Sequence, residues 1–134
     1  MGVLDQRAHD KLNTTQWKPL RDFFVQVAEV ILGISPDAQG VSAGNYVKFT
    51  TGPHPTSPVY AVVWPKMSLP KRVIVGLALP DDFEAEPLGP PPERLLYRGI
   101  TKFLVIYEEE TMPKGLSEWV KRAYEEVLSP DGLQ

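Results

Sequence analysis

His54 is the residue of this chain best placed for acid–base chemistry, because imidazole is the side chain that titrates near neutral pH. It stands between two prolines in the segment TTGPHPTSPVYAVVWP, residues 50–65. A general base needs a nucleophile and an orienting group within hydrogen-bond reach. Thr51, Thr56 and Ser57 are close in sequence, but no GxSxG motif frames them. The local pattern does not predict a catalytic site.

The prolines around His54 favour a structural role for the segment. Proline has no backbone N–H and is excluded from the interior of a central strand. Residues 51–58 are therefore predicted to form the connection of a β-hairpin, with His54 at its tip. A catalytic role remains only in an alternative site that combines His54 with the acidic residues Asp81 and Asp82.

Acidic side chains elsewhere do not have the spacing of a metal site. Asp81 and Asp82 begin the segment DDFEAE, which lacks the glycine-centred ligand spacing of an EF-hand loop. His9 stands between Asp5 and Asp10, but neither HExxH nor CxxC occurs. The acid–x–lysine pattern of a common nuclease class fails, and no phosphate-binding glycine motif is present. We predict no catalytic residue, no metal ligand and no cofactor.

The composition predicts one soluble domain. The 134 residues, of which 43% are apolar and 23% charged, suffice for one core, so residues 1–134 are taken as a single domain. With no cysteine, no apolar span of about 20 residues and no signal-like N-terminus, a cytoplasmic protein without membrane contact is expected. Fourteen prolines also hint at a thermophilic source.

Apolar periodicity predicts the elements of the fold. Helical spacing marks one helix within residues 14–37 and another over 115–128. Strands are predicted over residues 45–52, 59–64, 72–79 and 101–109, with a short one over 93–99. The short connections favour antiparallel neighbours. The fold class is therefore α+β: a two-layer sandwich in which an antiparallel sheet of four to five strands carries the N- and C-terminal helices on one face.

Aromatic residues on the predicted sheet suggest a binding surface. Alternation places Tyr60 and Trp64 on one face of a strand that is apolar on both faces. If the helices cover only one face, these two residues form an interface with Tyr46, Lys48 and Arg72. The competing interpretation buries the aromatics beneath the N-terminal segment or by sheet curvature. Replacing Tyr60 and Trp64 with Ser distinguishes the two, because interface residues tolerate the change and core residues do not.

The order of sequence blocks resembles a small family of α+β domains of unknown function. The likeness rests on LRDFFVQVAEVILGISPD, NYVKFTTG, RVIVGLALP and GLSEWVKRAYEEVL, and spans residues 18–128. Members stand alone or are fused to predicted restriction- or repair-type nucleases. The resemblance implies the same fold and an association with nucleic-acid enzymes. It supplies no catalytic residue.

Three functions are compatible with these patterns. The leading hypothesis is a non-catalytic module that dimerises or binds a protein partner through the sheet face around Tyr60 and Trp64. The first alternative is a small-molecule-binding protein or enzyme with a pocket between sheet and helices, using His54 and the acidic loop. The second is accessory nucleic-acid binding by the mildly basic strand region, although the net charge of −3 is far from the basic footprint of a dedicated nucleic-acid-binding domain.

Overall fold

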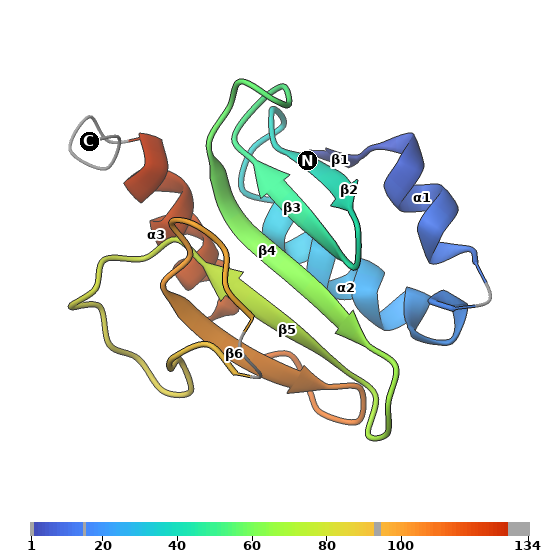
Figure 1. Ribbon diagram of the computed structural model, residues 1–134. Coiled ribbons are helices and arrows are strands. Elements are labelled where there is room, and N and C mark those ends of the chain that lie inside the picture. Colours follow the sequence, from blue (N-terminus) through green and yellow to red (C-terminus); the bar gives the residue numbers. More distant parts are fainter. Residues whose placement is uncertain (1, 15, 93–94, 129–134) are drawn as a thin grey trace.

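The computed structural model describes residues 2–14, 16–92 and 95–128, which form a six-stranded sheet with helices packed against it (Figure 1). The helices are α1 (Gln6–Leu12), α2 (Arg21–Leu32), α3 (Leu116–Leu128) and the 3-10 helix Lys18–Leu20. The strands are β1 (Val3–Leu4), β2 (Gln39–Ala43), β3 (Tyr46–Thr50), β4 (Val59–Lys66), β5 (Arg72–Leu77) and β6 (Lys102–Tyr107). Within these ranges, no helix is long and apolar enough to cross a membrane.

The sheet follows the order of the chain, from β1 at one edge to β6 at the other. Strands β2 to β6 form an antiparallel meander, in which the connections from β2 to β5 are short, as antiparallel neighbours allow, and the one between β5 and β6 is long. Residues 51–58 join β3 to β4, which confirms the predicted hairpin around His54. The α+β class is also confirmed.

Two details of the predicted sheet are wrong. It is mixed and has six strands rather than four to five, because β1 pairs in parallel with β2. The sequences of β1 (VL) and β2 (QGVSA) are too short or too weakly alternating to show a strand period. No strand forms over residues 95–99, and the remainder of the predicted strand 93–99 lies outside the described residues.

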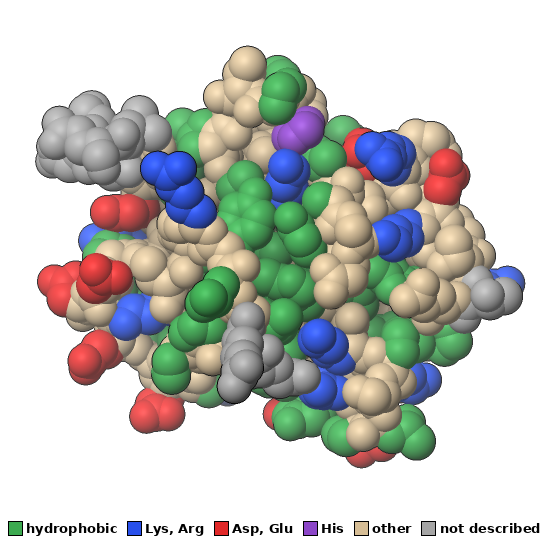
Figure 2. All heavy atoms as spheres, viewed as in Figure 1, with side chains coloured by type: hydrophobic (Ala, Val, Ile, Leu, Met, Phe, Trp, Pro, Cys, Tyr) green, Lys and Arg blue, Asp and Glu red, His purple; other side chains and the backbone are tan. Residues whose placement is uncertain are grey.

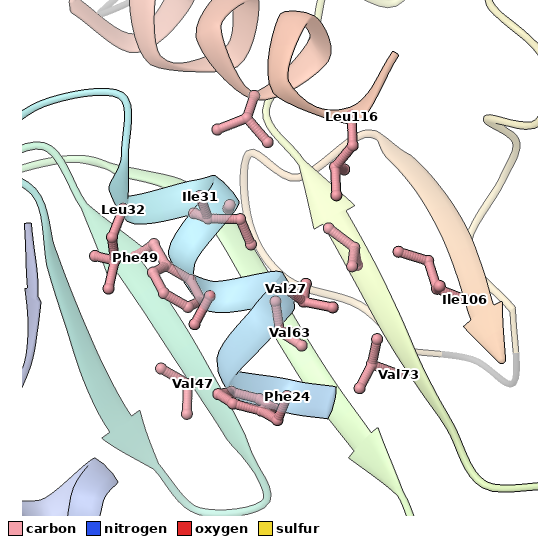
Figure 3. Packing of buried hydrophobic residues seen from close by; sticks show 14 of the residues in the cluster. Phe24, Val27, Ile31, Leu32, Val47, Phe49, Val63, Val73, Ile106 and Leu116 are labelled. Atoms are coloured by element: carbon pink, nitrogen blue, oxygen red, sulfur yellow. The ribbon is translucent and has the colours of Figure 1, made fainter. Parts of the chain in front are cut away.

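Helices α2 and α3 lie on one side of the sheet and enclose the main core (Figure 1). Phe24, Val27 and Ile31 form the apolar stripe of α2 and point toward β3 and β4, where Val47 and Val63 meet them (Figure 3). From α3, the buried side chains are Leu116, Val120 and Ala123. The predicted placement of both helices on one face is confirmed.

The long connection between β5 and β6, residues 78–101, contributes to both faces of the sheet. Phe83 packs against the core on the helix side, whereas Ile100 belongs to a second cluster on the opposite side. Gly89, which lies between these two residues in the sequence, exchanges two backbone hydrogen bonds of 2.9 Å with Phe103 of β6. The connection therefore passes around β6 and covers part of an edge strand, as stable sheets generally require.

Thr101 fixes the two ends of this connection to each other. Its Oγ1 donates a hydrogen bond to the Leu79 carbonyl (2.5 Å) and accepts one from the Leu79 backbone N–H (3.2 Å). We expect Thr101→Val to lower the free energy of unfolding by about 1 kcal/mol, the usual net value of such bonds. Urea unfolding measures the change, with the exposed Thr111→Val as the control. Equal stability of the two variants would contradict the assignment.

Candidate functional site

The sheet face opposite α2 and α3, which we call the front face, carries a second apolar cluster. Its buried members are Val62, Trp64, Ile74, Ala78, Ile100 and Phe103. Tyr46, Leu95, Tyr97 and Val105 are partly buried and pack over them. The connection between β5 and β6 therefore covers part of the front face, and the N-terminal segment does not cover it.

Aromatic rings organise the middle of this cluster. Trp64 lies between Tyr46 and Phe103, with ring centroids 5.9 Å apart in each pair. Tyr97 from the connection meets Tyr46 edge to face at 5.8 Å and 78°, a favoured aromatic geometry. Burial, and secondarily Tyr46, raises the pKa of Tyr97. The ring contacts leave Trp64 only 3% exposed, whereas Tyr46 and Tyr97 are half-buried and remain accessible to solvent.

Tyr60 does not share a face with Trp64, so this sequence-based prediction is wrong. Thr50 pairs with Val59 and Phe49 pairs with Ala61, which leaves Tyr60 as an extra residue in β4. Such a β-bulge shifts the alternation by one residue and moves the side chain to the other face. Tyr60 therefore joins the core beneath the helices and is 0% exposed.

The environment of Tyr60 is that of a structural residue. Its hydroxyl donates a 2.8 Å hydrogen bond to the Ile31 carbonyl near the end of α2. Its ring meets Tyr124 of α3 edge to face, with centroids 5.1 Å apart. Burial, with Tyr124 as a smaller contribution, raises the pKa of Tyr60. The residue ties both helices to the sheet and is not an interface residue.

The raised pKa of Tyr60 predicts a loss of stability in alkali. Above pH 10 the unfolded chain releases the phenolic proton while the folded chain retains it, so stability falls as pH rises. This one group accounts for up to about 1.4 kcal/mol per pH unit, from pH 10 up to its folded pKa. Tyr60→Phe should reduce the slope of unfolding free energy between pH 10 and 11. Identical slopes for wild type and variant would contradict the assignment.

The charged residues of the sheet are all basic. Strands β2 to β6 contain no Asp or Glu. By alternation with the buried residues of β3, β4 and β5, Lys48, Lys66 and Arg72 lie on the front face. Figure 2 shows hydrophobic side chains across the middle of this view with Lys and Arg side chains beside them, and Asp and Glu toward the rim. The front face is therefore apolar and locally basic in a chain of net charge −3.

The three basic residues differ in their surroundings. Arg72 is held by its own turn, because Nη1 donates to the carbonyls of Ser68 and Pro70, both at 3.2 Å. Lys48 and Lys66 are partly exposed and make no ion pair with the other described residues. The two lysines thus remain available on the front face, with Tyr46 in the row between them.

The alternative site built on His54 is not assembled. His54 is exposed on the β3–β4 connection, whereas Asp81 lines a cavity of about 420 Å³ beside α3 that His54 does not line. Asp82 follows it as an exposed residue of a turn. Among the described residues, no group of three or more His, Cys, Asp or Glu side chains is arranged to hold a metal ion.

Among the front-face residues that sequence reasoning missed are Lys66 and Tyr97. Lys66 could have been found, because it extends the alternation of Val62 and Trp64 by one step. Tyr97 gave no usable signal, since it lies in a connection whose path depends on packing against Tyr46 and on contacts far apart in the chain. The predicted residues Tyr46, Lys48, Trp64 and Arg72 do lie on this face together, by ring contact or by alternation.

Comparison of the chain with protein-family models, with curated proteins and with solved structures found no match.

Proposed function

We propose that the protein is a non-catalytic interaction module that binds a protein partner through the front face. The observation that carries this proposal is the combination of half-buried tyrosines with exclusively basic charges on a sheet without acidic strand residues. Aromatic centres surrounded by polar, solvent-accessible residues are typical of protein interfaces. The surface consists of Tyr46, Lys48, Lys66, Tyr97 and Val105.

Buried aromatic residues support the Tyr46 ring on this surface. Trp64 and Phe103 do not reach a partner, but they support Tyr46 from below through ring contacts. A contact residue whose orientation is set by packing loses little conformational entropy when it binds. Tyr46 is therefore the expected centre of the interface, with Lys48 and Lys66 at its rim.

Charge favours a different protein over a second copy of this chain. A two-fold dimer uses the same patch on both subunits. Through the front face it would bring Lys48 and Lys66 of each copy into one interface, without an acidic strand residue to pair with them. Like charges placed together across an interface disfavour association.

Site-specific photo-crosslinking tests the proposed function. A benzoylphenylalanine residue replaces Lys48 on the front face in one variant and Lys121, an exposed residue of α3, in the control. In cells of the source organism we expect position 48 to give a discrete adduct that position 121 does not give. Equal adduct patterns, or none at position 48, would refute the proposal. An adduct of twice the chain mass would identify a second copy as the partner.

A further inference from the structure

We infer that the front face binds an extended acidic segment of its partner, with carboxylates at Lys48 and Lys66 and an apolar side chain over Tyr46. This inference rests on the proposed function and adds the chemistry of the partner. It follows from the register of β3 and β4, from the charges on the face and from the burial of its aromatic rings.

The register sets the spacing of the acidic groups. Lys48 pairs with Val62, and Lys66 lies four residues farther along β4. At a rise of about 3.3 Å per residue, the two lysines are separated by about 13 Å along the strands. An extended peptide places side chains i and i+4 on one side at the same separation. Carboxylates at those two positions would reach both lysines.

The position between the two lysines requires an apolar side chain. Trp64 lies midway between Val62 and Lys66 on β4, and the Tyr46 ring packs beside it. Residue i+2 of the bound peptide would therefore lie over Tyr46 and the edge of Tyr97. The expected recognition pattern is acidic–x–apolar–x–acidic.

Burial of the rings favours a peptide over single-stranded nucleic acid. Nucleic-acid binding on a sheet depends on aromatic faces that are free to stack with bases. Here Trp64 and Phe103 are 3% and 2% exposed, and Tyr97 meets Tyr46 edge to face. Two lysines that make no ion pair with the described part of the chain are also few for a phosphate-driven interaction.

The test uses a labelled peptide with the sequence Gly-Glu-Ser-Phe-Ser-Glu-Gly, a Lys-for-Glu analogue and a ten-residue oligo(dT). Binding is followed by amide chemical shifts in two-dimensional NMR spectra and by the salt dependence of affinity. We expect the acidic peptide to shift the amides of Tyr46, Lys48 and Lys66. We expect the Lys48→Glu, Lys66→Glu double variant to bind at least about tenfold more weakly, the effect of losing two charge-assisted contacts.

The matched control is the Lys18→Glu, Lys121→Glu double variant, which makes the same change in net charge at exposed residues off the front face. It should bind the peptide within about twofold of the wild type, an affinity difference of less than about 0.5 kcal/mol. Equal binding of the Lys-for-Glu analogue, stronger binding of oligo(dT), or no shift at the named amides would overturn the inference. If adducts at position 48 persist despite such a result, the proposed function stands and only the acidic chemistry of the partner is wrong.

Discussion

Replacing Tyr60 with Ser is expected to lower the free energy of unfolding by about 3–5 kcal/mol, the range measured for truncation of buried aromatic side chains. The ring is fully buried between the sheet and both helices. Its loss creates a cavity, removes the edge-to-face contact with Tyr124 and leaves the Ile31 carbonyl without its hydroxyl donor. Chemical denaturation followed by circular dichroism measures the difference.

Tyr60→Phe is the matched control for this prediction. It keeps the ring and removes only the hydroxyl, so we expect a loss of about 0.5–1.5 kcal/mol. The interface hypothesis built on Tyr60 and Trp64 predicts instead that Ser is tolerated and that assembly changes. A stable, folded Tyr60→Ser protein would restore that hypothesis and contradict the bulge described above.

Gly76→Ala is expected to lower the free energy of unfolding by about 1–3 kcal/mol, as overpacking of a close-packed core does. A methyl group at this position would lie 2.5 Å from Ile100 Cγ2 and 2.9 Å from Phe103 Cε2. Gly76 is in the interior of β5, so the backbone has little freedom to yield. The glycine is present because the connection must approach the sheet closely there.

The control for Gly76 is Gly89→Ala, since a methyl group at Gly89 has no neighbour within 4 Å. We expect its effect to remain within about 0.5 kcal/mol. Combining Gly76→Ala with Ile100→Ala should recover part of the loss, because adjacent residues are energetically coupled. Additive effects of the two substitutions would show that Ile100 does not pack on Gly76.

The sequence predicted those elements whose residues show a clear period. The stripe of α2 and the alternation of Val47 and Phe49 in β3 each mark one buried face, so the elements and their orientation follow from the pattern. β4 is different, because VYAVVW is apolar at every position. No polar residue marks its faces, and a one-residue bulge at Tyr60 therefore left no trace in the pattern.

The cover of the front face could not be predicted for a different reason. Residues 78–101 are rich in proline and charge, as exposed connections are. Their packing depends on three residues. Gly76 has no side chain and so leaves room on the sheet, and Ile100 and Tyr97, which pack on the front face, lie far from it in the sequence. Such complementarity is a property of the assembled fold. The positions of Tyr46 and Lys48 on the front face, by contrast, follow from simple alternation.

The front face is the surface that we propose to bind an acidic partner. Strands β2 to β6 contain no Asp or Glu, and Lys48 and Lys66 make no ion pair with the other described residues. Figure 2 shows Lys and Arg side chains beside the hydrophobic middle of this face, with Asp and Glu side chains only toward the edges of the view. A substitution that reverses one of these lysine charges should therefore impair binding.

Lys66→Glu tests this central claim most directly, by one paired measurement of melting temperature and acidic-peptide affinity. Lys66 is partly exposed, and surface substitutions usually change the free energy of unfolding by less than about 0.5 kcal/mol, so we predict a nearly unchanged melting temperature together with weaker peptide binding. A variant that keeps its melting temperature and binds the peptide as well as the wild type would contradict the proposal that this face is a binding surface for an acidic partner.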